Sequence, residues 1–167
     1  MPRILTVVRR TLAPLSRTRA FRALGPRLLP GAERLARRLS GGRVQVSGLL
    51  VPSLTLHTVG ARSGESRATE LMYTPDGRGN AIVAGSNFAR DRHPAWTHNL
   101  IAHPEARITV GRRRYDVVAT RIDTDPDERE AAWARLERQW PGYRGYERDS
   151  GRQVRLFRLR LLRELDR

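Results

Sequence analysis

Ten residues near the middle of the chain, Thr58 to Arg67, read TVGARSGESR and decide how the chain around them folds. The residues that lead into this stretch, 54–59, alternate apolar and polar side chains, as a half-buried strand does. Two glycines and two serines then interrupt the alternation, and a second strand is indicated at 67–74. The sequence therefore predicts two neighbouring strands joined by a turn that carries arginines.

The turn itself has the composition of an anion-binding loop. Arg62 and Arg67 supply guanidinium groups, which bind phosphate or carboxylate through paired hydrogen bonds, and Ser63 adds a hydroxyl. Gly64 lets the backbone approach a ligand, and amide groups in a turn add further donors. The alternative is a solvated turn whose Arg–Glu65 ion pairs contribute about 0–1 kcal/mol. Composition alone favours this alternative, because turns rich in Gly, Ser and Arg are common.

Turn and cap residues predict the elements that follow. The stretch 75–80, PDGRGN, indicates a turn; a helix opens near Pro94, which suits its first position, and closes at Pro104. Asp125 is expected to cap a helix that begins with Pro126 and runs to Trp140. The remaining predicted elements are strands at 81–85, 107–110, 115–121 and 154–162 and a short helical piece at 143–149. Five or six short, mostly antiparallel strands with flanking helices indicate an α+β fold, a small barrel with helical cover.

The charge of the chain is uneven. All 32 basic residues are Arg, and of the formal net charge of +15, residues 1–43 carry +10. We therefore divide the chain into a basic arm, 1–43, and one domain, 44–167. A nucleic-acid-binding module would interleave aromatic residues with its basic face, whereas only 6% of this chain is aromatic, so we expect no nucleic acid partner. The absence of Cys excludes disulfides and fits the cytoplasm.

The arm has the pattern of basic amphipathic helices. At 100° per residue one face gathers the apolar residues Ile4, Leu5, Val7, Val8, Leu12 and Leu15, with arginines opposite. No apolar run approaches the roughly 20 residues of a membrane span. One interpretation places the arm on an anionic membrane surface, at the inner face of the cell membrane. The other packs it on the domain or on the second subunit of a homodimer.

Two further groups of residues invite a chemical interpretation. His93, His98 and His103 are spaced by five, about 140° apart on a helix, so they cannot share a face, and we expect no metal site. Tyr143 and Tyr146 are three apart, next to a tryptophan. Such a cluster either lines a ligand pocket or belongs to the hydrophobic core, and the pattern alone favours the core.

Taken in order, four motifs resemble the deazaflavin-dependent nitroreductase family of actinobacteria. They are the stretch 58–67, then Gly85-Ser86-Asn87-Phe88, then HPAWTHNL at 93–100 with Pro104 behind it, and finally PGYRGY at 141–146. The resemblance covers about residues 40–162. Each motif alone is weak, whereas the ordered set is specific. The chain departs from the family pattern at Phe88-Ala89, where Gly-Gly or Phe-Gly is frequent, and at 152–155, where R-x-I-P is replaced by RQVR.

This resemblance implies a split β-barrel similar to the FMN-binding barrels and binding of coenzyme F420. That cofactor is an 8-hydroxy-5-deazaflavin with a phosphate and an oligoglutamate tail, and its anionic groups suit the arginine-bearing turn. The cofactor-binding residues carried over from the family are Arg62, Ser63, Gly64, Arg67, Ser86, Asn87 and Trp96, with Trp96 near the anionic tail. FMN is the alternative; its single phosphate would leave part of the arginine set unused.

The resemblance also implies a reaction, hydride transfer from reduced deazaflavin to a quinone, a nitroaromatic or an activated alkene. Tyr143 and Tyr146 correspond to the family's substrate-pocket tyrosines, and Tyr146 is expected to donate a hydrogen bond to the oxygen that gains charge. An arm on the membrane would bring this site close to a quinone dissolved in lipid. The alternative is a deazaflavin- or lipid-binding protein of the same fold without turnover.

Overall fold

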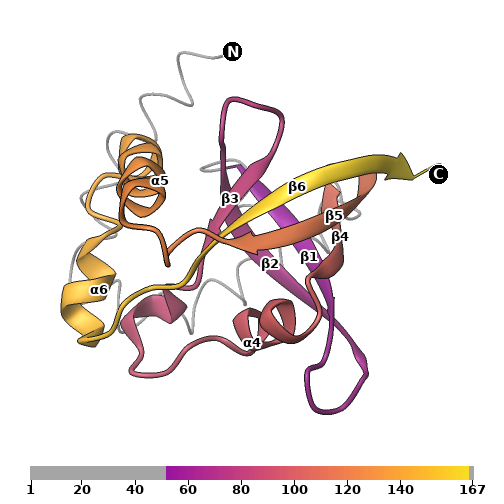
Figure 1. Ribbon diagram of the computed structural model, residues 1–167, viewed down its shortest axis with the longest axis horizontal. Helices are drawn as coiled ribbons and strands as arrows, with labels where there is room; N and C mark the ends of the chain where they lie inside the picture. Colours follow the sequence, from indigo (N-terminus) through magenta and orange to yellow (C-terminus); the bar gives the residue numbers. More distant parts are fainter. Residues whose placement is uncertain (1–51, 166–167) are drawn as a thin grey trace, which may run out of the picture.

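Six antiparallel strands close into a barrel in the computed structural model, which describes residues 52–165 (Figure 1). Around the barrel the order is β1-β2-β3-β6-β5-β4, and the pairing of β1 with β4 completes the circle. The strands are β1 (Ser53–Val59), β2 (Ser66–Pro75), β3 (Ala81–Ala84), β4 (Glu105–Val110), β5 (Arg113–Arg121) and β6 (Leu156–Leu165). The predicted α+β barrel of antiparallel strands with flanking helices is confirmed.

Alternating side chains fill the barrel interior. In β1, Leu54 and Leu56 are buried and their neighbours are half-buried, as the period of a strand requires. The buried members of this barrel core are Leu54, Leu56, Ala81, Val83, Trp96, Leu100, Ile108, Val117, Ala119, Phe157 and Leu159. Nearly every strand therefore contributes to one continuous apolar cluster, which is the main stabilising feature of the fold.

A second core lies outside the barrel, under two helices. Helices α5 (Pro126–Gln139) and α6 (Gly145–Ser150) lie together on one side of the barrel (Figure 1). Their core includes Ile82, Ala84, Ile122, Ala132, Trp133, Leu136, Tyr143, Val154 and Leu156. Strand β3 faces both cores, because its alternate residues join the barrel cluster and the helix-covered cluster. This double burial explains why all four residues of β3 are apolar.

Helix α4 (Ala95–Ala102) and the short 3-10 turn η1 (Asn87–Ala89) lie at the end of the barrel to which the β1–β2 turn extends (Figure 1). Trp96 and Leu100 of α4 reach into the barrel core. The packing of α4 thus brings the third sequence motif to the same end of the molecule as the first.

Helix starts were predicted well, with one correction. Asp125 caps α5 through a hydrogen bond from the Glu128 amide, at 2.9 Å, and Pro126 occupies the first position of the helix, as expected. Pro94 was expected at the first position of α4 but is its N-cap, because its ψ of 146° is extended. Its carbonyl accepts hydrogen bonds from both the amide and the hydroxyl of Thr97.

The last strand begins later than predicted and runs further. The sequence pattern indicates a strand from Val154 to Leu162, whereas β6 extends from Leu156 to Leu165. The amide of Val154 donates to a carboxylate oxygen of Glu147, at 2.5 Å, so a side chain of α6 takes the place of a strand partner. At the other end Leu165 still pairs with Arg114 of β5.

The predicted arm, 1–43, and the start of the domain at 44 lie outside the described residues. Within residues 52–165 no helix combines the length and the apolar character that a membrane crossing requires.

Candidate functional site

The turn between β1 and β2 is closed by its own backbone. Gly60 donates to the carbonyl of Glu65 and Gly64 donates to the carbonyl of Gly60, both at 2.8 Å. A side chain at Gly60 would lie 2.6 Å from the Ser63 hydroxyl, and Gly64 has a φ of +69°, which favours glycine. The geometry of the turn therefore favours glycine at position 64 through its φ, and at position 60 a side chain would require Ser63 to move. Arg62 is exposed at its tip.

A buried amide side chain fixes this turn to α4. The Oδ1 of Asn99 accepts a hydrogen bond from the amide of Ala61 at 3.0 Å, and its Nδ2 donates to the Thr58 hydroxyl at 3.0 Å. Asn99 and Thr58 are 7% and 4% exposed, so these bonds are shielded from water. Asn99 lies within the third sequence motif, 93–100, which suggests no role for its side chain. Its partners lie about 40 positions away, so no local pattern could have revealed the connection.

Arg67 is held by an acid of the same turn. Its Nη2 lies 2.5 Å from Glu65, and the two side chains are 58% and 64% exposed. A pair this exposed contributes about 0–1 kcal/mol, so a more strongly bound anion can displace Glu65. The Ser63 hydroxyl accepts a hydrogen bond from the Glu65 amide at 3.3 Å. Arg62, Ser63, Gly64 and Arg67 thus lie in or directly beside one turn, and their part in binding a cofactor stays a prediction.

The second motif forms a strained loop. Asn87, Phe88 and Ala89 have φ values of 50°, 53° and 59°, the left-handed region that side chains disfavour. The Asn87 amide group donates to the carbonyl of Arg92 at 2.8 Å. Phe88 is 50% exposed. Three consecutive left-handed residues need support from their surroundings.

Arg152 supplies that support. Its guanidinium donates to three backbone carbonyls around the loop: Gly85 at 3.0 Å, Ser86 at 2.8 Å and Arg90 at 3.0 Å. In the sequence, residues 152–155 stand out only as a departure from a family pattern. The contacts of Arg152 cross 62 to 67 positions of sequence, so its role becomes visible only in three dimensions.

The loop meets the fourth motif through one hydrogen bond. The Ser86 hydroxyl lies 3.2 Å from the hydroxyl of Tyr143. Tyr143 is 7% exposed, with its ring edge-on to Trp133 at 5.9 Å and to Tyr146 at 5.5 Å. Burial raises the pKa of Tyr143 to about 12, so its hydroxyl keeps its proton. Tyr143 is therefore a core residue with a polar tip, whereas Tyr146 is only half-buried.

The family resemblance places Trp96 near the anionic tail of the cofactor, but its side chain is more deeply buried than that position suggests. It is 5% exposed and packs on Phe157 with ring centroids 5.6 Å apart, inside the barrel core. Its structural contribution is to anchor α4 in the barrel.

Two histidines of α4 and of the loop before it lie among arginines. The ring centroids of His93 and His98 are 6.3 Å apart. Burial and the charges of Arg155 and Arg152 lower the pKa of His93 to about 4. Burial, Arg155 and Arg62 lower the pKa of His98 as well. Within residues 52–165 no three ligand-type side chains converge as a metal site.

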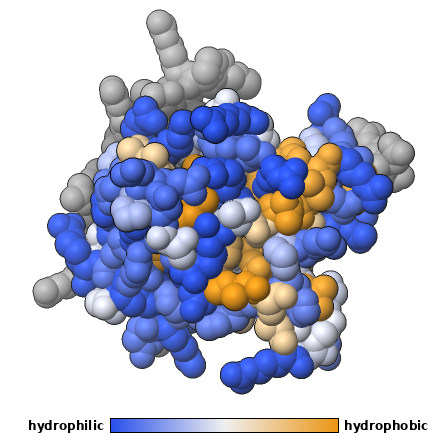
Figure 2. Space-filling model, viewed as in Figure 1, coloured by the Kyte–Doolittle hydropathy of each residue, from blue (hydrophilic) through white to orange (hydrophobic). Residues whose placement is uncertain are grey.

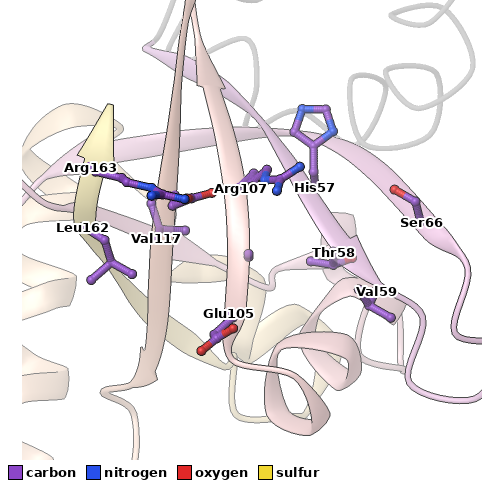
Figure 3. A pocket seen from close by; sticks show the side chains of 11 residues that line it. His57, Thr58, Val59, Ser66, Glu105, Arg107, Val117, Leu162 and Arg163 are labelled. Carbon is purple, nitrogen blue, oxygen red and sulfur yellow. Dashed lines mark hydrogen bonds and ion pairs between the residues drawn. The ribbon is translucent and has the colours of Figure 1, made fainter. Parts of the chain in front are cut away.

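A separate groove of about 620 Å³ is lined by residues of β1, β2, β4, β5 and β6 (Figure 3). It begins beside the β1–β2 turn at Thr58, Val59 and Ser66 and extends to Leu162 and Arg163 of β6. Its remaining lining residues are His57, Glu105, Ala106, Arg107, Asp116 and Val117.

The charges inside the groove are largely satisfied by one another. Asp116 accepts from Arg107 at 3.1 Å and from Arg163 at 2.8 Å. The groove contains neither Ser86 nor Tyr143, so this groove and the side chains with the most distinctive chemistry lie apart. We place the candidate site at Ser86 and Tyr143, because a closed ion-pair network offers little to a charged ligand.

Figure 2 shows apolar surface over α4 and towards the outer end of β6, where Ile101 and Leu162 are exposed.

Comparison with known proteins identifies relatives of this chain. Residues 32–160 match the family described as F420H(2)-dependent quinone reductase. An F420H(2)-dependent quinone reductase of Mycobacterium tuberculosis is 46% identical over 77 residues, which are 46% of this chain and 51% of that protein. The match therefore spans about half the length of this curated relative.

Solved structures support the same fold. The F420-H2-dependent reductase FDR-A superimposes with a TM-score of 0.58 at 27% identity, over 65% of this chain and 93% of that chain. A heme-binding protein of Mycobacterium smegmatis gives a TM-score of 0.53 at 21% identity, over 68% of this chain and 48% of that chain. The second likeness is one of fold alone.

Proposed function

Because the chain belongs to the family of F420H(2)-dependent quinone reductases, we propose that it binds coenzyme F420 and reduces a quinone by two electrons. The observation that carries this proposal is the hydrogen bond between Ser86 and Tyr143, 57 positions apart. It joins two of the four motifs through side chains that the family resemblance had singled out independently.

The residues present fit this cofactor. Arg62, Arg152 and Arg155 form no ion pair with a carboxylate of residues 52–165, so their charge is available to a phosphate or to carboxylates. The half-exposed Phe88 and Tyr146 offer apolar surface for an aromatic ring. FMN, with one phosphate and no tail, would use fewer of these cations.

We assign cofactor binding to the first two motifs. Arg62, Ser63, Gly64 and Arg67 would hold anionic groups, with the ligand replacing Glu65 as the partner of Arg67. Ser86 and Asn87 would lie against the deazaflavin, on a loop that Arg152 fixes. Trp96 would act by anchoring α4, since its indole is occupied by Phe157.

When bound, the reduced cofactor supplies the hydride, and the chain supplies placement and hydrogen bonding. Tyr146 would donate a hydrogen bond to the substrate oxygen that gains negative charge. Tyr143, buried and protonated, would position Ser86 and support the ring of Tyr146. Nitroaromatics and activated alkenes are further candidate acceptors within this proposal, because they too have an electron-poor centre that accepts hydride.

We retain the basic arm, 1–43, as a proposed means of bringing the site close to a lipid-dissolved quinone by lying on an anionic membrane surface. The alternative is that the arm packs on the domain or on the second subunit of a homodimer. The argument for the membrane surface is the segregation of apolar and arginine residues in its sequence. Sedimentation with anionic and with neutral vesicles tests it: binding to the anionic vesicles alone supports the membrane role, and binding to neither contradicts it.

A fluorescence titration tests the proposed cofactor. The full chain, with its tryptophans Trp96, Trp133 and Trp140 as reporters, is titrated with oxidised coenzyme F420 and in parallel with FMN. We expect saturable F420 binding that weakens about tenfold in Arg62→Ala, because a charge-assisted hydrogen bond contributes about 1.5–3 kcal/mol. The matched control is Arg113→Ala, which removes an exposed arginine of β5 paired with Glu164. Absence of F420 binding, or tighter binding of FMN, would contradict the proposal.

A further inference from the structure

Three segments of the chain meet at the carboxylate of Glu147, in an arrangement of Arg129, Glu147 and Val154 that we call the Glu147 clamp. Arg129 of α5 donates through Nη2 to Oε1 of Glu147, and the Val154 amide donates to the same oxygen at 2.5 Å. The Nη1 of Arg129 donates to the Val154 carbonyl at 3.1 Å. The side chains of Arg129 and Glu147 are 11% and 15% exposed, so the clamp is largely shielded from water. The clamp therefore joins α5, α6 and the segment before β6.

Helix α5 is the fixed end of the clamp. The Arg129 guanidinium lies over the ring of Trp133, 5.9 Å from its centroid, and Trp133 is 1% exposed. Ala132, Trp133 and Leu136 of α5 are buried in the core under the two helices. Arg129 thus rests on the same core to which Tyr143 belongs.

Helix α6 is the end that depends on the clamp. None of its six residues is buried, and a helix of this length is far shorter than the roughly 12–15 residues of an independently stable one. Gly142 before it and Gly151 behind it have φ values of 85° and 66°, so the chain turns through the left-handed region on both sides. Glu147 directly follows Tyr146 in this helix. The place of Tyr146 therefore depends on the contacts that Glu147 makes outside the helix.

The segment before β6 connects the clamp to the loop at residues 85–90, which we call the Ser86 loop. Arg152, two positions before Val154, donates to three backbone carbonyls of this loop. The clamp thus lies between the helix that carries Tyr146 and the segment that holds the Ser86 loop. These are the two sides of the candidate site.

We propose that Glu147 is a positioning residue for the reaction, and that it holds the Tyr146 hydroxyl in place relative to the Ser86 loop. This assignment rests on the proposed function, in which Tyr146 donates to the substrate oxygen and Ser86 lies against the deazaflavin. Glu147 acts through Tyr146 and is assigned no contact with either ligand. Placement matters at this scale, because a displacement of about 1 Å can lower a rate about 100-fold. Two groups on separate segments keep such precision only if the segments are joined.

The competing explanation is that the buried ion pair only stabilises the fold. Removal of one partner leaves a buried charge unpaired, which is destabilising, so reduced activity of a single variant would not separate the two explanations. The double variant, Arg129→Met with Glu147→Gln, removes both charges at similar volume, and the new amide oxygen can still accept from the Val154 amide. Much of the stability should therefore return in the double variant.

The matched control is Glu130→Gln. Glu130 also connects α5 to the start of α6, through Arg144, but the two side chains are 60% and 43% exposed. An ion pair this exposed contributes little, so its loss should leave both sides of the candidate site in place.

Hydrogen exchange of the full chain, followed by mass spectrometry, tests the clamp without any ligand. In Glu147→Gln and in the double variant we expect the amides of residues 145–150 and 85–92 to exchange about tenfold faster relative to those of β1. Glu130→Gln should change neither segment. Unchanged exchange of either segment in the double variant would overturn the proposal.

Kinetic coupling to Tyr146 tests the positioning role. With reduced F420 saturating, Glu147→Gln and the double variant should each lower kcat for quinone reduction about tenfold. In a Tyr146→Phe background the same changes should cause no further loss, because the hydroxyl that Glu147 positions is gone. Losses that multiply, or a kcat that recovers together with stability in the double variant, would show that the pair only stabilises the fold.

The two experiments also separate this inference from the proposed function. Faster exchange of both segments in a chain that binds no F420 supports the clamp and refutes the proposed function. Quinone reduction by the wild type with unchanged kcat in Glu147→Gln supports the proposed function and refutes the role of Glu147.

Discussion

At the scale of single residues, Tyr143 and Tyr146 are identical side chains in different surroundings, and we expect them to have different roles. Tyr143 is buried against Trp133 with its hydroxyl on Ser86, whereas Tyr146 is half-buried and packs edge-on against Tyr143. The first position suits a structural role, and under the proposed function the second would face the substrate. The spacing in the sequence singles out both tyrosines but does not report burial, and the choice of Tyr146 as the donor comes from the family resemblance alone.

Tyr146→Phe should lower turnover about 100-fold while the affinity for coenzyme F420 changes little. The phenyl ring keeps the packing on Tyr143, whereas the donor to the developing negative charge is lost. Steady-state reduction of a quinone and a cofactor titration measure the two effects. Turnover equal to that of the wild type would exclude the assigned role of Tyr146. Tyr143→Phe is the companion variant and should reduce thermal stability as well, because Ser86 loses its partner.

His93 should make the stability of the protein sensitive to mild acid. Its pKa is about 4 in the folded protein and near 6.5 when unfolded, so between these values the unfolded chain binds the extra proton. Stability is therefore fully present above pH 6.5 and is lost as the pH falls towards 4. The slope of the free energy of unfolding against pH reflects the number of extra protons that the unfolded chain binds. His93→Gln, whose side-chain oxygen can still accept the hydrogen bond from Arg152, should reduce that number by up to about one.

Chemical denaturation of both proteins between pH 4 and pH 8 measures the difference. Above pH 6.5 the two curves should run parallel, which provides an internal control. Asp76 and Asp123, whose folded pKa values are lowered mainly by hydrogen bonds against the effect of burial, lose their contribution only at still lower pH. Identical slopes down to pH 4 would show that His93 is not held neutral.

At the scale of elements, regular strands and capped helices were predictable and the connections between them were not. Strand β1 and helix α5 follow from alternation and from Asp125, which are local features. The start of β6 was misplaced because the Val154 amide binds Glu147 of another element. Arg152 and Asn99 were likewise assigned no role, since their partners are tens of residues away. Local pattern specifies elements, whereas long-range hydrogen bonds position the site.

Replacing alanine by glycine should change the stability of the protein in opposite directions at two positions, one of which lies in the η1 loop. Ala89 has a φ of 59°, and a left-handed alanine costs about 1–2 kcal/mol, slightly more than the entropy that glycine loses on folding. Ala89→Gly should therefore stabilise the protein by about 0.5 kcal/mol. Ala68→Gly, at an exposed position of β2, should destabilise it by about 0.5–1 kcal/mol. Urea denaturation gives both values, and a loss of stability in Ala89→Gly would show that the loop is not strained.

At the scale of the whole molecule, the candidate site lies where two cores meet. Trp96 belongs to the barrel core and Tyr143 to the core under α5 and α6. Gly85 lies between them, where a side chain would come 2.8 Å from Thr97, which is fully buried. The loop that carries Ser86 is thus held between the barrel core and the core under α5 and α6. Binding residues on such a support lose little freedom when a ligand arrives.

Trp96 allows the role of this junction to be tested, because anchoring and ligand contact predict different behaviour. Trp96→Ala should lower the free energy of unfolding by about 3–5 kcal/mol, since it leaves a cavity beside Phe157. Trp96→Phe keeps an aromatic ring in the barrel and should cost less. If the indole only anchors α4, Trp96→Phe binds coenzyme F420 as tightly as the wild type in equilibrium dialysis. A large loss of affinity in this stably folded variant would instead place the indole against the cofactor, and α4 would then have to shift out of the barrel when the ligand binds.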